Sequence, residues 1–214
     1  MKHIKVLILS LVISLLSLPS WGETVSWGEL VTNPENGLVY KIFTSVPFTG
    51  SITPTLDNLS GGSYKKGKKH GVWETFYENG LLRSKGNYKD RKKHGVWKSY
   101  HKNGQLESKV NYTDGKEEGI YEFYHKNGQL NSKVNYTDGK GEGLYEHFDK
   151  NGKLFVTGIY KDGKNDGLWK FYYKNSQLKI SINYKDGELN GILKSYNEDG
   201  SLNATKTYKN GVEQ

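Results

Sequence analysis

The sequence is notable first for what it lacks: there is no cysteine, and 214 residues include only four prolines and one methionine. Without cysteine there is no disulfide framework, no thiol nucleophile and no lipid-modified N-terminal cysteine. Aliphatic residues are scarce beyond the first twenty positions, so a compact two-layer core rich in leucine and valine is not expected. The 26 glycines, interleaved with aromatic residues, predict many tight turns rather than disorder.

The longest apolar run lies at the N-terminus. Lys2 and Lys5 precede an apolar and serine run over residues 6–18, and small residues follow up to Gly22. This order predicts a signal peptide over residues 1–22 that is cut after Gly22, and therefore a protein exported to the bacterial periplasm or secreted. The run is short for a membrane-spanning helix, and an uncleaved N-terminal anchor is the alternative.

Positive charge is concentrated in one segment. Residues 64–102 contain twelve basic and three acidic side chains, whereas residues 103–214 contain sixteen of each. The first of these segments therefore accounts for the net positive charge of the chain that follows the predicted cleavage site.

The chain is built from a 24-residue repeat. The unit reads Y-x-D-G-K-x-x-G-[VIL]-[WY]-x-x-[FY]-x-x-N-G-x-L, followed by five looser residues. Its first tyrosine recurs without insertion at Tyr64, Tyr88, Tyr112, Tyr136, Tyr160, Tyr184 and Tyr208. Asp-Gly and Asn-Gly dipeptides suit turns between antiparallel strands, and strand-length runs such as 71–77 and 81–88 lie between them. No run is long enough for a helix before the next turn.

We therefore expect an all-β fold, an elongated and twisted antiparallel meander of repeated β-hairpins in a single-layer or coiled sheet. Residues 64–214 form the hairpin array, with six full units and a partial seventh. Residues 23–63 form an N-terminal segment in which 37–52 is a degenerate repeat that caps the sheet edge, followed by a polar connection over 53–63.

The blocks 70–82 (HGVWETFYENGLL) and 160–178 (YKDGKNDGLWKFYYKNSQL) resemble the MORN repeat variant. This variant occurs in proteins described as YwqK-type antitoxins of bacterial toxin–antitoxin systems. The resemblance covers residues 64–214. It implies an extended array of β-hairpins without enzymatic activity, and a role in scaffolding proteins, contacting membrane lipids or neutralising a toxin.

The residue pattern also argues against an active site. His70 and His94 share one repeat position, so their backbones should lie about 9.6 Å apart, too far for one zinc ion to bind both easily. Ser108 and Ser132 recur as copies and supply no unique triad. Asp162 beside a turn glycine is expected to form the turn. We expect no enzyme, no cofactor and no metal.

Two sets of side chains remain as candidate binding surfaces. An aromatic row could stack on sugars if it faced solvent, or instead pack the sheet itself: Trp73, Trp97, Tyr121, Tyr145 and Trp169. A basic set at successive turns could attract anionic lipid head groups or an acidic partner, or merely solubilise the turns: Lys65, Lys66, Lys68, Lys69, Arg91, Lys92 and Lys93.

The expected function is an exported, non-enzymatic binding or scaffold module. A protein is the foremost expected partner, with anionic lipid head groups or a glycan as further candidates. A toxin-neutralising antitoxin and a carbohydrate- or cell-wall-binding module are the alternatives. Nucleic acid is not expected, because no motif that reads it is present.

Overall fold

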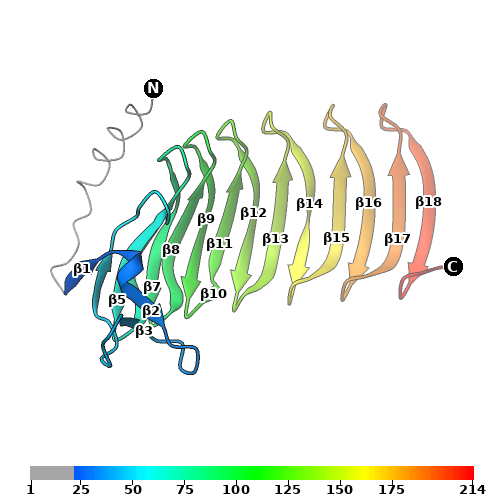
Figure 1. The fold of residues 1–214 in the computed structure, drawn as a ribbon. Helices are drawn as coiled ribbons and strands as arrows, with labels where there is room; N and C mark the ends of the chain where they lie inside the picture. Colours follow the sequence, from blue (N-terminus) through cyan, green and yellow to red (C-terminus); the bar gives the residue numbers. More distant parts are fainter. Residues whose placement is uncertain (1–21) are drawn as a thin grey trace. The chain divides into compact units, whose positions relative to one another are not determined.

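The structure is a computed structural model that describes residues 22–214, so the predicted signal peptide lies outside the described residues except for Gly22. The described residues divide into two compact units, 22–104 and Gln105–Gln214. Figure 1 shows that the hairpins of each unit follow one another in chain order.

The described part of the first unit contains eight strands and one short 3₁₀ helix. These are β1 (Glu23–Val25), η2 (Trp27–Glu29), β2 (Leu30–Thr32), β3 (Val39–Lys41), β4 (Gly50–Ile52), β5 (Ser60–Lys65), β6 (Lys68–Phe76), β7 (Leu82–Lys89) and β8 (Lys92–Tyr100). Strands β5 to β8 pair antiparallel in chain order, while β2 and β3 form a separate two-stranded sheet.

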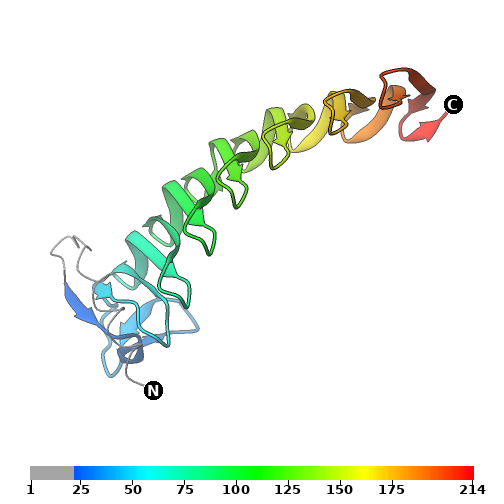
Figure 2. The ribbon, with the colours of Figure 1, turned by 90° about the horizontal axis from the view of Figure 1, so that it is seen from above.

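The second unit contains eleven strands. These are β9 (Leu106–Thr113), β10 (Lys116–Glu117), β11 (Gly119–Tyr124), β12 (Leu130–Thr137), β13 (Lys140–Phe148), β14 (Leu154–Lys161), β15 (Lys164–Tyr172), β16 (Leu178–Lys185), β17 (Glu188–Tyr196), β18 (Leu202–Lys209) and β19 (Val212–Glu213). From β11 onward each strand pairs antiparallel with the next, and Figures 1 and 2 show these strands side by side in one layer. The predicted meander of β-hairpins with a 24-residue period is confirmed.

The two turn signals of the repeat make different turns. At Asp162-Gly163 both residues have positive φ, 51° and 78°, as a two-residue type I′ turn requires. At Asn151-Gly152 only the glycine has positive φ, and the amide of Gly152 donates to the carbonyl of Asp149 at 2.9 Å. That is a type I turn followed by a left-handed glycine, which also joins antiparallel strands.

A third repeated glycine lies inside a strand rather than at its start. Gly167 in β15 has a φ of 71°, and the register with β14 shifts between Thr157 and Ile159. A left-handed glycine permits such a bulge, which bends the strand without ending it. For this reason β6 begins at Lys68, three residues before the predicted run 71–77.

Consecutive hairpins are joined by hydrogen bonds between their turns. The side-chain amide of Asn127 donates to the carbonyl of Lys150 at 2.7 Å, and that of Asn175 donates to Glu198 at 2.9 Å. At the other strand ends, the amide of Gly163 donates to the carbonyl of Gly141 at 2.9 Å. Each repeat is therefore stabilised mainly by its immediate neighbours, as in other one-dimensional repeat proteins.

The N-terminal segment covers the first edge of the hairpin array in its unit. Strand β4 pairs antiparallel with β5, and β1 adds to β4 in parallel. The buried side chains here include Val25, Phe48, Ile52 and Tyr64. The predicted connection over 53–63 is too long, because β5 already begins at Ser60, where its backbone pairs with β6.

Candidate binding surfaces

A strip of exposed lysines marks one end of the strands in the first unit. We call this strip the basic edge, and it consists of Lys65, Lys66, Lys68, Lys89 and Lys92. Two turns form it, and they are held together by the amide of Arg91, which donates to the carbonyl of Lys69 at 2.9 Å. Lys89 belongs to this strip but was not among the predicted residues. Its position opposite Lys92 depends on how β7 and β8 pair, which the structure shows.

The basic edge places like charges opposite each other. Lys65 pairs with Lys68 across β5 and β6, and Lys89 pairs with Lys92 across β7 and β8. Like charges directly opposite on neighbouring strands are destabilising. Within residues 22–214, none of the five lysines forms an ion pair with a carboxylate.

Two of the corresponding turns in the second unit carry counter-charges, although Lys161 and Lys164 are opposed there as in the basic edge. Lys116 pairs with Asp138 at 2.6 Å, and Lys140 pairs with Asp162 at 3.4 Å. These carboxylates come from the Asp-Gly turn of the next hairpin. In the basic edge the first turn has Lys66-Gly67, and the second has Asp90-Arg91, where Asp90 forms no ion pair with the five lysines. The excess positive charge is therefore a local property of the first unit.

Three of the predicted basic residues make contacts with aromatic rings or backbone groups of the same unit. The ammonium of Lys69 lies 4.1 Å from the ring centre of Trp73, and burial lowers the pKa of Lys69. Lys93 lies over Trp97 at 4.7 Å. The guanidinium of Arg91 donates to the carbonyl of Asn36 at 3.3 Å. These side chains contribute to packing and to the attachment of the N-terminal segment.

The tryptophans of the aromatic row are buried against neighbouring residues of the sheet. Trp73, Trp97 and Trp169 are 3 %, 9 % and 4 % exposed. Tyr121 and Tyr145 are half-buried, and Tyr145 stacks on Trp169 with ring centres 5.6 Å apart. An open stacking surface for sugars requires exposed rings, so the burial of the tryptophans favours the packing role.

Each buried tryptophan lies flat on a glycine of the preceding strand. A Cβ atom added to Gly158 would lie 2.1 Å from the ring of Trp169, and Gly86 stands in the same relation to Trp97. The indole Nε1–H of Trp169 donates to the carbonyl of Ile159 at 3.1 Å. The glycine provides room for the ring, and the hydrogen bond satisfies its polar atom.

The residues at these two positions vary together along the chain. The residue eleven positions before each aromatic-row position depends on which side chain occupies that position. It is glycine where the position holds tryptophan, valine where it holds tyrosine, and isoleucine where it holds leucine. The pairs are Gly62–Trp73, Gly86–Trp97, Val110–Tyr121, Val134–Tyr145, Gly158–Trp169 and Ile182–Leu193. Side-chain volumes compensate each other, as expected of a closely packed core.

The opposite face of the second unit exposes a row of aliphatic side chains. We call it the aliphatic row: Ile120, Leu144, Leu168 and Ile192. These side chains are 43–61 % exposed and repeat every second strand, so adjacent members are separated by about 9.6 Å. Each directly precedes the aromatic-row position, and adjacent residues of a strand point to opposite faces. That parity is the sequence signal for the row.

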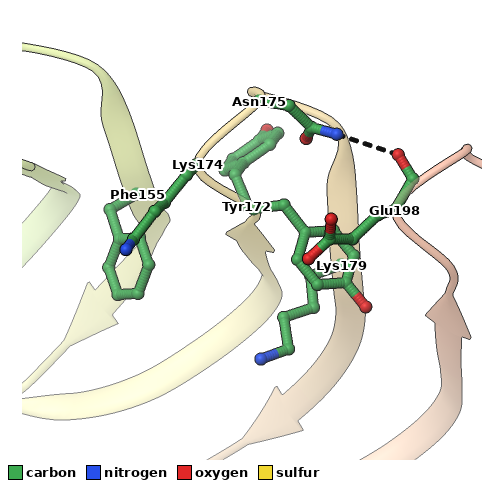
Figure 3. A pocket seen from close by; sticks show the side chains of 7 residues that line it. Phe155, Tyr172, Lys174, Asn175, Lys179 and Glu198 are labelled. Carbon is green, nitrogen blue, oxygen red and sulfur yellow. Dashed lines mark hydrogen bonds between the residues drawn. The ribbon is translucent and has the colours of Figure 1, made fainter.

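One shallow hollow of the second unit lies where the repeats differ. It has a volume of about 450 Å³ and is lined by residues that include Phe155, Tyr173, Lys174 and Lys179 (Figure 3). Phe155 stands where the other units have Arg83, Glu107, Asn131, Lys179 and Asn203. The hydroxyl of Tyr173 donates to the carbonyl of Tyr196 at 2.8 Å, so this ring is held in place.

The described residues contain no group of three or more histidine, aspartate or glutamate side chains placed to hold a metal ion. Among residues 22–214, no helix is long and apolar enough to cross a membrane.

Comparison with known proteins identifies the repeats. Six segments match the family described as MORN repeat variant, at residues 69–90, 93–114, 117–138, 141–162, 165–186 and 189–210. No curated protein matches the chain. One solved structure is described as "Crystal structure of GtfA/B complex bound to UDP and GlcNAc". The two sequences are 15 % identical, and the TM-score is 0.23. The match covers 51 % of this chain and 22 % of that chain, so this chain spans about a fifth of the length of the solved one.

The six family matches follow one another with the 24-residue period of the hairpins. Together they include 132 of the 214 residues, which is more than half of the chain. This protein belongs to the MORN repeat variant family.

Proposed function

We propose that this protein is a non-enzymatic scaffold that attaches to an anionic membrane surface through the basic edge of its first unit. MORN repeats are generally modules that bind proteins or membranes, and the family is typically non-catalytic. The finer proposal is supported chiefly by the five lysines of the basic edge, which are exposed and have no carboxylate partner among the described residues.

A lipid surface provides the ion-pair partners that the five lysines lack within the described residues. Phosphate groups of anionic lipids lie close together, so several can approach the opposed pairs Lys65–Lys68 and Lys89–Lys92 at once. Each lysine near such a surface contributes about 1 kcal/mol, or roughly a fivefold gain in affinity. This attraction should decay within a Debye length, about 8 Å at physiological ionic strength.

The test is co-sedimentation of the purified protein with vesicles of phosphatidylcholine containing phosphatidylglycerol. We expect binding that weakens with salt and falls at least a hundredfold when all five lysines of the basic edge are changed to glutamine. A matched control changes five exposed turn lysines of the second unit to glutamine: Lys116, Lys140, Lys161, Lys164 and Lys185.

The control removes the same charge from a different place. It should keep most of the vesicle binding, because two of these lysines already have carboxylate partners. Equal losses in both variants would show that net charge alone drives association. Undiminished binding after removal of the basic edge would refute its proposed role.

A protein partner is the second candidate, favoured by the aliphatic row of the second unit. Four exposed aliphatic side chains at regular spacing provide apolar area for a docked protein. Leu144→Lys together with Leu168→Lys should abolish co-purification of a partner from the envelope fraction, whereas the exposed Leu202→Lys outside the row should not. A captured toxin would support the antitoxin hypothesis, and equal capture by both variants would refute a role for the row.

We also propose that the protein is exported after cleavage behind Gly22. The first strand begins at Glu23, directly after the predicted cleavage site, which supports a folded domain that starts there. Sequencing the N-terminus of the protein from its own cells should find Glu23 first. An intact Met1 on all molecules would refute the cleavage.

A further inference from the structure

We infer that the loop over residues 42–46 inserts apolar side chains into the membrane surface to which the basic edge attaches. The inference rests on the proposed function, because it concerns the same unit and the same lipid surface. It adds a segment that lies outside the matched repeats.

The loop exposes three apolar side chains within five residues. Phe43 is 104 % exposed, Val46 is 72 % exposed and Ile42 is 37 % exposed. A phenylalanine normally buries much of its large side chain, so complete exposure of its ring calls for an explanation. Residues 37–52 were predicted to form a degenerate repeat that caps the sheet edge, and that prediction did not include exposed apolar side chains in this loop.

The exposure of Phe43 follows from a defined turn rather than from a loose chain. The amide of Thr44 donates to the carbonyl of Lys41 at 3.1 Å, and the hydroxyl of Thr44 donates to the same oxygen at 2.7 Å. Phe43 is the third residue of this turn and has a φ of 65°. Glycine or asparagine usually occupies such a position, so the phenylalanine keeps an unfavourable backbone conformation there.

The base of the loop is attached to the basic edge. The amide of Val39 donates to the carbonyl of Gly67 at 3.0 Å, and the amide of Gly67 donates to the carbonyl of Phe48 at 2.7 Å. The amide of Lys66 donates to the hydroxyl of Thr49 at 2.9 Å. The segments on both sides of the loop therefore contact the first lysine-bearing turn, and Figure 1 shows β3 at that end of the strands.

A membrane interface matches both features together. Its phosphates attract lysines, while the boundary between head groups and acyl chains accepts aromatic and aliphatic side chains. Electrostatic attraction by itself is lost at high salt, whereas burial of apolar area is not. An inserted loop would thus give the protein a component of membrane affinity that resists salt.

Insertion of the loop can be tested with a fluorescent label. Because the sequence contains no cysteine, a single introduced cysteine is the only site that a thiol-reactive dye can label. Ser45→Cys with an environment-sensitive NBD dye places the probe in the loop and retains all three apolar side chains. Leu81→Cys places the same probe at the opposite end of the strands of the same unit, between β6 and β7. Both labelled proteins are mixed with phosphatidylcholine vesicles that contain phosphatidylglycerol.

We expect the Ser45 probe to shift to the blue, to brighten severalfold and to be quenched by lipids with a nitroxide near the head group. The Leu81 probe should keep its emission in water. Salt-sensitive vesicle binding without a response at Ser45 would overturn the insertion and leave the proposed surface attachment standing. Failure of the unlabelled protein to bind the vesicles at all would overturn both.

A second variant separates insertion from folding. Phe43→Gly suits the positive φ of the turn, so its thermal midpoint should be equal to or higher than that of the parent protein. Its binding to anionic vesicles should be about tenfold weaker, and the difference should persist at high salt, because the buried ring is lost. Unchanged affinity in this variant would refute the role of Phe43. If the Phe43→Gly variant bound an acidic protein as tightly as the parent protein does, and neither bound the vesicles, the partner would be a protein rather than a membrane.

Discussion

The contact between Gly158 and Trp169 allows the packing of the second unit to be tested by substitution. A valine at position 158 would place its Cβ about where the indole now lies, since an ideal Cβ there is 2.1 Å from the ring. The ring must move, and its hydrogen bond to the carbonyl of Ile159 is then lost. Overpacking costs about 1–3 kcal/mol and the hydrogen bond about 1 kcal/mol, so Gly158→Val should lower the free energy of unfolding by about 2–4 kcal/mol.

The chain itself provides the compensating substitution. Val134 and Tyr145 occupy the same two positions one repeat earlier. Trp169→Tyr alone should cost about 2 kcal/mol, because the smaller ring leaves space above Gly158. The double variant recreates the Val–Tyr pair and should lose about 2 kcal/mol less than the sum of the single changes.

Chemical denaturation followed by circular dichroism measures these differences, and amide hydrogen exchange in β14–β16 shows whether the loss is local. Gly141→Val is the matched control, because an added Cβ at Gly141 makes only ordinary contact at 3.5 Å with Tyr160. It should change the free energy of unfolding by less than about 1 kcal/mol. Additive effects in the double variant, or a Gly158→Val cost equal to that of the control, would refute the volume compensation.

Two further predictions concern pH and the links between hairpins. Burial, with a smaller effect of nearby His125, lowers the pKa of His147 below its ordinary value of 6.5. The unfolded chain then binds a proton before the folded one, so stability should fall as the pH drops below about 6.5. His147→Phe should weaken this dependence in urea titrations at pH 5 and 7, and an unchanged slope would contradict it. Asn127→Ala removes the 2.7 Å bond to the carbonyl of Lys150 and should cost about 1 kcal/mol in chemical denaturation, whereas no loss would show that water replaces the amide.

Local chemistry made the hairpin array predictable. Asp-Gly and Asn-Gly dipeptides recur every 24 residues, and each favours a turn whatever the distant parts of the chain do. The bend at Gly167 was not predicted, because a glycine within a strand-like run does not by itself distinguish a bulge from a strand start. The different turn types at the two dipeptides likewise became clear only from their φ values.

The candidate surfaces were predictable in part. The concentration of lysines in residues 64–102 placed the basic surface in one segment. Which lysines are open to a partner depends on their neighbours in the folded sheet: Lys69 lies on Trp73 of its own strand, while Lys89 faces Lys92 across the hairpin. The exposure of Ile120 and its equivalents depends on which face the tryptophans bury, a choice that alternation alone leaves open.

The sequence by itself determined the period, the antiparallel hairpins and the excess of positive charge, because turns and composition act locally. Only the tertiary structure decided that the tryptophans rest on glycines eleven residues earlier, because that contact requires two strands to pair in one register. The same is true of Phe43, whose ring is exposed because hydrogen bonds to Lys41 hold it in a left-handed turn beside the basic edge. Contacts between strands and turns, rather than the repeat motif, distinguish the surfaces available for binding.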